Sequence, residues 1–283
     1  MEVGLLMLVG GIAAGAFGSL LGLGGGLLIV PLLTFGFGLP LREAVGVSLV
    51  CVIVTSSAAA SVYLERRQAN LRLGMVLELF TAIGAIAGGL VAFLIDERVL
   101  AGLFAVLLVY VAVSMLRSRS ATADALLAGA SDATAPVAAR KSDTGFSSAM
   151  HAAVGASEQP IRRYPAGVAG SIVAGVASAL LGIGGGTVKV PVMHLVMGVP
   201  LKVATATSNL MIGITASASA VVYVLRGGID INAAGPTAVG VFVGATLGSR
   251  LGRRVNVRLL RLLFVAVLLF TAFEMARRAA GLS

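Results

Sequence analysis

The sequence predicts an all-α protein that crosses a membrane many times and is built from two related halves. Three observations predict this fold class. Hydrophobic residues make up 58% of the 283 residues and charged residues only 12%, whereas soluble domains contain roughly 45–50% and about 25%. About ten apolar runs follow one another along the chain, and motifs of the first half recur in the second. The mean hydropathy of +1.02 also indicates that lipid surrounds much of the surface.

The apolar runs are the predicted helices, taken in order. Five occupy residues 4–21, 27–39, 44–64, 74–95 and 99–116, and five more occupy residues 165–181, 187–199, 204–225, 233–249 and 259–276. A helix rises about 1.5 Å per residue, so roughly 20 residues span a hydrocarbon core of about 30 Å. Most runs are long enough to cross. The runs at 27–39 and 187–199 are too short, which predicts short or broken helices.

A hydrophilic segment separates the two sets of runs. Residues 118–163 are rich in Ser, Ala, Thr and Asp, a composition that cannot bury enough apolar surface to fold alone. The sequence therefore predicts a first membrane repeat at residues 1–117, a disordered linker at 118–163 and a second membrane repeat at 164–283.

A shift of 160 positions aligns the two halves. The aligned pairs are Gly22-Leu23-Gly24-Gly25-Gly26 with Gly182-Ile183-Gly184-Gly185-Gly186, Val30-Pro31 with Val190-Pro191, Ser48 with Ser208, Tyr63 with Tyr223, Gly84 with Gly244, and Phe104 with Phe264. Chance does not hold one register over so long a stretch, so the halves are a duplicated unit.

The basic loops predict that the second half is inverted in the membrane. Lys and Arg are enriched in cytoplasmic loops. The Arg-rich loop follows the third run in the first half, at residues 65–72, but the fourth run in the second half, at residues 250–258. If the two halves have opposite orientations, both loops and the linker lie in the cytoplasm. The predicted topology is therefore a 5+5 inverted repeat with both termini outside. Arg277 and Arg278, near the outer C-terminus, count against this topology.

The two glycine clusters are the predicted substrate site. Inverted-repeat transporters bind substrate where helices break near the bilayer midplane and backbone N–H groups face an anion. The predicted amide donors are Gly22, Gly24, Gly25, Gly26, Gly182, Gly184, Gly185 and Gly186. Close helix packing is the alternative role, and it is the better interpretation for the glycines spaced by four: Gly84, Gly88, Gly244 and Gly248. No Gly-Lys-Ser/Thr follows either cluster, which excludes a Walker phosphate loop.

Four side chains are further substrate-binding candidates. Lys189 is a charged residue inside a glycine-motif hairpin and is predicted to pair with an anion; the alternative is that its amine reaches a membrane interface. Ser48 and Ser208 occupy symmetric positions and, with Asn209, could donate hydrogen bonds to an oxyanion. A serine hydroxyl can instead bond to a carbonyl of its own helix.

Glu78 and His194 are candidates for ion coupling, because a carboxyl group and an imidazole can each carry a proton. Glu78 lies about one turn into its run, so an interfacial position is an alternative. His194 could equally be a packing histidine. The coupling ion is predicted to be a proton or a sodium ion.

The remaining features exclude several function classes. The net charge of +9 comes from clusters between apolar runs, without the interleaved aromatics of a nucleic-acid surface. Cys51 is the only cysteine, which excludes a paired-thiol redox site and a thiolate metal cluster. His194 has no GxSG serine to activate. We therefore expect no enzyme, catalytic residue, metal or cofactor; a membrane scaffold without transport activity is the alternative function.

The glycine clusters, each followed by Val-Pro, resemble the TauE/SafE family of sulfite and sulfonate exporters. The resemblance covers both halves, roughly residues 1–117 and 164–283. It implies a multi-pass permease of the cytoplasmic membrane that moves sulfite, sulfoacetate or related organosulfur anions outward. The expected partners are this small anion, a coupling proton or sodium ion and the lipid bilayer; the oligomeric state is left open.

Overall fold

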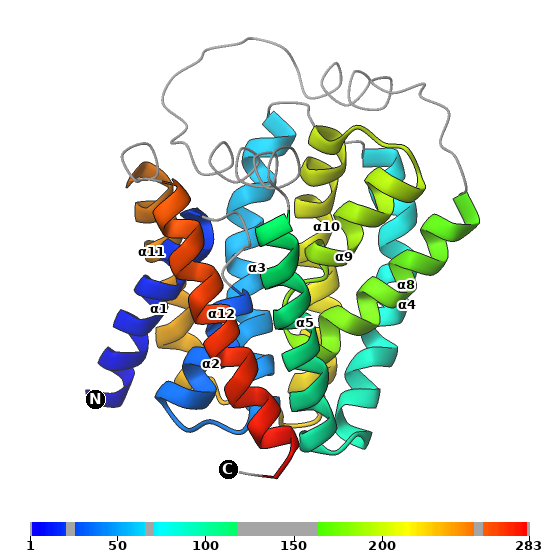
Figure 1. Cartoon of the computed structure of the whole chain (residues 1–283). Coiled ribbons are helices and arrows are strands. Elements are labelled where there is room, and N and C mark those ends of the chain that lie inside the picture. The colour runs from blue at the N-terminus through cyan, green and yellow to red at the C-terminus, as the bar shows by residue number, and fades with distance from the viewer. Residues whose placement is uncertain (1, 21–25, 66–70, 118–163, 252–256, 282–283) are drawn as a thin grey trace.

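The computed structural model describes residues 2–20, 26–65, 71–117, 164–251 and 257–281, and the regular elements in these ranges are all helices (Figure 1). The first half contains α1 (Glu2–Leu20), α2 (Gly26–Pro31), α3 (Leu41–Glu65), α4 (Leu71–Leu94) and α5 (Glu97–Arg117). The second half contains α8 (Tyr164–Leu181), α9 (Gly186–Pro191), α10 (Leu201–Leu225), α11 (Ile231–Leu251) and α12 (Val257–Ala279). The predicted linker, residues 118–163, lies outside the described residues.

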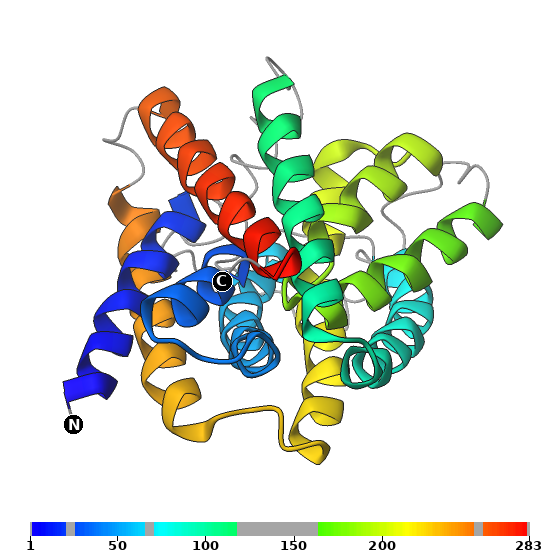
Figure 2. The ribbon, with the colours of Figure 1, turned by 60° about the horizontal axis from the view of Figure 1, so that its bottom comes forward.

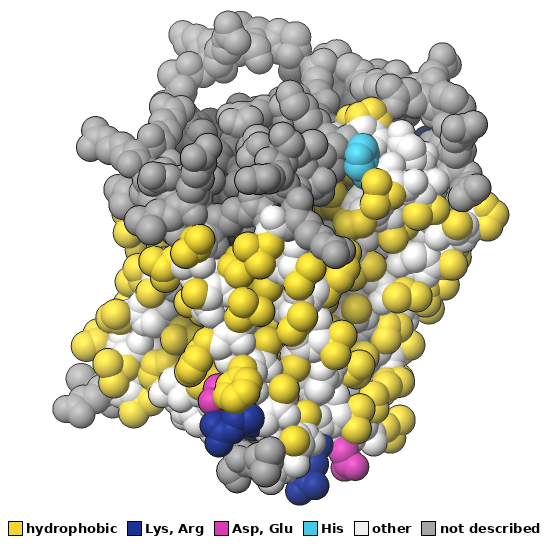
Figure 3. Space-filling view, viewed as in Figure 1, with side chains coloured by type: hydrophobic (Ala, Val, Ile, Leu, Met, Phe, Trp, Pro, Cys, Tyr) yellow, Lys and Arg dark blue, Asp and Glu magenta, His cyan; other side chains and the backbone are white. Residues whose placement is uncertain are grey.

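The surface of these helices is that of a membrane protein. Within the described residues, four helices are long and apolar enough to cross a membrane, at Arg72–Leu94, Glu97–Ser114, Val203–Leu225 and Ile231–Gly248. Large hydrophobic side chains are exposed along them, such as Leu79, Tyr110 and Phe242. Hydrophobic side chains cover the middle of the face in Figure 3, while charged side chains gather at its lower edge. Lipid rather than water suits such a surface.

Two short helices interrupt the bundle at equivalent places. Helix α2 continues into a π-helical turn at Leu32–Gly36, and α9 continues into another at Val192–Val196. Pro31 and Pro191 are the last residues of α2 and α9. Proline has no N–H and its ring clashes with the preceding turn, so the regular α-helical hydrogen bonding cannot pass through it unchanged. The widened turn begins directly after each proline.

The equivalent helices of the two halves keep the register that the sequence shift predicts. Helices α2 and α9 begin 160 residues apart, as do α3 and α10. Gly46, early in α3, packs against Gly228, just after α10, so α3 and α10 run antiparallel. Gly74, early in α4, instead packs against Thr207, early in α10, so α4 and α10 run parallel. Both chain ends consequently lie at the same side of the bundle (Figure 1).

The first helix of each half packs against a helix of the other half. Helix α1 lies beside α11, and α4 lies beside α8 (Figure 2). Both contacts depend on glycine: a Cβ added to Gly84 would lie 2.3 Å from the carbonyl oxygen of Ile172, and one added to Gly244 would lie 2.1 Å from that of Ile12. These two contacts are related by the 160-residue shift. The packing interpretation of these spaced glycines is therefore confirmed for Gly84 and Gly244, where only glycine lets the backbones approach so closely.

Candidate functional site

The second glycine motif forms a tight loop between α8 and α9. Gly182, Gly184 and Gly185 have φ angles of 68°, 75° and 73°, in the left-handed region that side chains with a Cβ rarely adopt. The loop ends at Gly185, the residue before α9. The first motif cannot be compared in the same way, because Gly22, Gly24 and Gly25 lie outside the described residues.

The backbone N–H groups of this loop are largely without acceptors. The N–H of Gly182 donates to the Ser178 carbonyl at 2.9 Å, and the amides of Val188 and Lys189 both donate to the Gly185 carbonyl. Residues 182, 184 and 185 lie in turns, but among the described residues none accepts a hydrogen bond of normal distance and angle from the five amides of residues 183–187. The amides of Gly186 and Thr187 belong to the first turn of α9, where a helix leaves its N–H groups unpaired. Buried N–H groups elsewhere are nearly always paired, so the unusual donors are those of residues 183–185, which are buried.

Three hydroxyl groups near the loop are also without a partner in the described part of the chain. They are those of Ser178, Thr187 and Ser208. Ser178 and Ser208 are fully buried. A Cβ added to Gly186 would lie 3.6 Å from the Ser208 hydroxyl oxygen, and one added to Gly185 would lie 3.3 Å from the Ser178 Cβ. Helices α8 and α10 thus bring hydroxyls to the same loop that carries the unpaired amides.

Ser48 joins the two glycine motifs. Its hydroxyl lies 3.1 Å from the Gly26 carbonyl oxygen and 2.8 Å from the Gly182 carbonyl oxygen, and these two acceptors share its proton. A hydroxyl has one proton to donate, so that proton is engaged in this conformation. Ser48 and Ser208, predicted as a symmetric pair, therefore differ: Ser48 bridges the halves, whereas Ser208 has an unpaired hydroxyl.

Side chains of α3 and α10 pack tightly over the loop. A Cβ added to Gly184 would lie 2.6 Å from Ile212 and 2.8 Å from Val52, and one added to Gly26 would lie 2.7 Å from Val52. The glycines are thus needed for close packing as well as for their backbone conformation. The close-packing role is therefore present at this motif, and the substrate-binding role stays a prediction.

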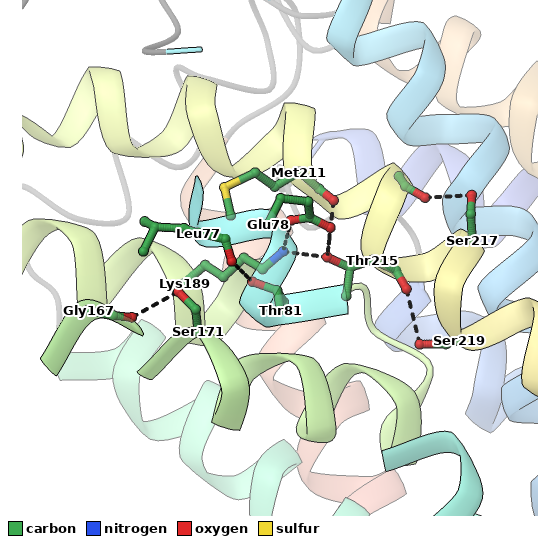
Figure 4. A network of polar contacts seen from close by, with 11 residues as sticks. Leu77, Glu78, Thr81, Gly167, Ser171, Lys189, Met211, Thr215, Ser217 and Ser219 are labelled. Atoms are coloured by element: carbon green, nitrogen blue, oxygen red, sulfur yellow. Dashed lines mark hydrogen bonds and ion pairs between the residues drawn. The ribbon is translucent and has the colours of Figure 1, made fainter. Parts of the chain in front are cut away.

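Lys189 lies in a buried polar cluster with Glu78 and Thr215, hereafter the charge triad (Figure 4). The lysine Nζ is 3.0 Å from Glu78 Oε2 and donates to Thr215 Oγ1 at 2.5 Å. Thr215 Oγ1 in turn lies 2.6 Å from Glu78 Oε1. Lys189 is 2% exposed and Glu78 4%, so the alternative in which the lysine amine reaches an interface is wrong for this conformation. Its partner here is a carboxylate.

Sequence reasoning did not identify Thr215 or the pairing of Lys189 with Glu78. Glu78 and Lys189 are 111 residues apart and lie in different halves, so no local pattern links them. One signal was available: Thr215 follows Ser208 by two helical turns, and residues at this spacing share a helix face.

The other two candidates lie outside the triad. His194 is half-buried, and its Nδ1 lies 2.9 Å from the Val199 carbonyl oxygen, across the turn that ends the short helix. That contact suits a packing histidine. Asn209 is half-buried on α10. No group of three potential metal ligands occurs within the described residues.

Comparisons with known proteins identify relatives along nearly the whole chain. The family model described as "Sulfite exporter TauE/SafE" matches residues 7–275. A probable membrane transporter protein, YunE of Bacillus subtilis, is 24% identical over 278 residues, which cover 96% of each chain. Probable membrane transporter proteins of Methanocaldococcus jannaschii and Xylella fastidiosa are 25% and 28% identical and cover 93% and 94% of this chain, and 91% and 93% of their own. No solved structure matches the chain significantly.

Proposed function

Since the chain belongs to the sulfite exporter TauE/SafE family and is a membrane transporter, we propose that it moves small sulfur-containing anions, such as sulfite and organosulfonates, across the cell membrane. Transport is secondary, driven by an ion gradient, and proceeds by alternating access in the export direction that the family description names. The proposal involves no catalytic step and no cofactor.

The observation that carries this proposal is the set of unpaired donors around the second glycine motif. Five consecutive amides and three hydroxyls have no acceptor in the described part of the chain. Sulfite and sulfonate groups present three oxygen acceptors on one sulfur, which suits several donors converging on one loop. Gly182, Gly184, Gly185 and Gly186 would bind through the backbone, and Ser208 through its hydroxyl. By the repeat, Gly22, Gly24, Gly25 and Gly26 would contribute the opposite side.

The proposed alternating access rests on an inverted repeat. Its support is the common register of the two halves, the antiparallel course of α3 and α10, and the reciprocal exchange of helices between the halves. In transporters built this way, rocking of one repeat against the other exposes a central site to each side in turn. The enrichment of Lys and Arg in cytoplasmic loops supports a topology in which residues 65–72, 118–163 and 250–258 face the cytoplasm.

Uptake and exchange of labelled sulfite by reconstituted vesicles test the function. Ser208→Ala should raise the sulfite concentration needed for half-maximal transport, because it removes an unpaired donor, and should leave folding unimpaired since no existing hydrogen bond is lost. The matched control is Ser217→Ala on the same helix, whose hydroxyl bonds to the Gly213 carbonyl of its own helix; it should transport normally.

A second variant tests the loop itself. Gly185→Ala should abolish transport, since a methyl group would lie 3.0 Å from the Ala174 carbonyl oxygen. Gly227→Ala is the control: Gly227 also has a positive φ, of 67°, but a Cβ there meets nothing within 4 Å. If wild-type vesicles move neither sulfite nor sulfoacetate, the transport function is refuted and the scaffold alternative is favoured.

A further inference from the structure

The charge triad is a buried, electrically balanced group at the contact between the two halves. Glu78 comes from α4 of the first half, whereas Lys189 and Thr215 come from α9 and α10 of the second (Figure 4). One positive and one negative charge face each other at 3.0 Å. A buried ion that loses its counter-ion is strongly unfavourable. Neither charge can therefore be removed or moved without a compensating charge.

The duplicated architecture does not require this ion pair. The positions 160 residues away from Lys189, Glu78 and Thr215 are Ile29, Ala238 and Thr55. Ile29 and Ala238 are buried apolar residues, so the equivalent place in the other half is filled without any charge. Replacing a buried ion pair by apolar residues of similar size is often neutral or stabilising. The pair is thus better explained by function than by stability.

The triad and the proposed anion site share two helices, α9 and α10. Lys189 lies two residues after Thr187 on the short helix α9, and Thr215 lies two turns after Ser208 on α10. The Lys189 amide also donates to the Gly185 carbonyl of the loop. A change in the partner of the Lys189 amine therefore acts on the same two helices that carry the unpaired hydroxyls.

Lys189 is the charged group that faces Glu78 in the described part of the bundle. Helix α4 packs against α8 and α10. The described side chains of α8, residues 165–181, include none that ionises, and those of α10, residues 203–225, include only Tyr223, which donates to the Ala179 carbonyl. On α4 itself, Arg72 lies six residues earlier and is exposed. The net charge of the triad therefore depends on whether the Glu78 carboxylate is ionised or protonated.

Given the transport function proposed above, we propose that Glu78 carries the coupling proton and that Lys189 binds the anion when Glu78 is protonated. A proton from water on one side bonds to a carboxylate oxygen of Glu78, which leaves the Lys189 ammonium without a counter-ion. The anion then takes the place of the carboxylate. On the other side the anion leaves, Glu78 returns its proton to water, and the ion pair re-forms. A monoanion and a proton cross together, so net export occurs where the outward gradient of the anion exceeds the inward gradient of the proton.

Proteoliposomes loaded with the purified full-length protein test this coupling. The probe is labelled methanesulfonate, the anion of a strong acid, whose charge does not change across the physiological pH range. An acid-outside pH gradient should drive its accumulation, and an imposed membrane potential should have little effect because no net charge moves. Accumulation driven by a sodium gradient at equal pH would overturn the proposal, as would accumulation that follows the membrane potential alone.

Variants at the carboxylate isolate its role. Glu78→Gln keeps the shape of the side chain and one of its two acceptor oxygens but cannot take up a proton. It should retain exchange of internal for external methanesulfonate and lose accumulation under the pH gradient. Glu43→Gln, which removes a carboxylate from the first turn of α3, should retain both. Gradient-driven accumulation by Glu78→Gln would overturn the assignment.

A measurement on the wild-type protein keeps the test independent of folding. Binding of methanesulfonate to the purified protein in weakly buffered solution should take up about one proton per anion, by the linkage between the two equilibria. Binding without proton uptake would overturn the proposal. If the wild type moves neither sulfite nor methanesulfonate, the transport function itself fails; if exchange occurs but a pH gradient drives nothing, only the coupling role of Glu78 fails.

Discussion

Gly244→Ala tests the closeness of the contact between α1 and α11. A Cβ at this position would lie 2.1 Å from the Ile12 carbonyl oxygen, whereas real Cβ contacts are essentially never shorter than 3.0 Å. The two backbones would therefore have to separate by about 1 Å over a contact that joins the halves. Such overpacking costs about 1–3 kcal/mol, so we expect the free energy of unfolding to fall by that amount.

The matched control is Gly4→Ala on α1, in the same contact between α1 and α11. A Cβ there would lie 3.7 Å from Pro236 Cγ, an ordinary van der Waals distance, and alanine favours a helix over glycine by about 1 kcal/mol. The expected change is therefore neutral or slightly stabilising. Both variants add one methyl group to this helix pair, and they differ in what that group meets.

The only cysteine provides the assay. Cys51 is fully buried, so a fluorogenic maleimide should react with it only when the fold opens. Heating the detergent-solubilised protein with this reagent gives an unfolding midpoint for each variant. Gly244→Ala should open at a lower temperature than the wild type, and Gly4→Ala should not. Equal midpoints for the two variants would refute the close approach of α1 and α11.

Three further predictions use the same assay. Lys189→Met should cost about 3–5 kcal/mol because it strands the Glu78 carboxylate, and adding Glu78→Leu should restore most of the loss; if the double variant is as unstable as the single one, the two charges are not coupled. Ser48→Ala should cost about 1–3 kcal/mol, since two glycine carbonyls lose their donor; an unchanged midpoint would show that the two motifs are not joined there. Tyr223→Phe should cost about 1 kcal/mol through the bond to the Ala179 carbonyl, and any gain in stability would contradict that bond.

The sequence was sufficient for the class of fold and the position of its breaks. Apolar composition predicted a membrane protein, and the short runs beginning at Leu27 and Thr187 correspond to the short helices α2 and α9. The shift of 160 residues also agrees with the spacing of α3 and α10, which begin 160 residues apart. These features could be predicted because run length, proline position and repeat spacing depend only on the order of residues along the chain and not on which helices are in contact.

Only the tertiary structure decided which polar groups meet. In a membrane protein the lipid-facing and protein-facing sides of a helix are both apolar, so the sequence does not indicate which helices pack together. The exchange of α1 and α8 between the halves was therefore not predictable from hydropathy. Glu78 reaches Lys189 and Thr215 only because α4 packs among helices of the other half, and that long-range packing turns two candidates with separate roles into one paired group.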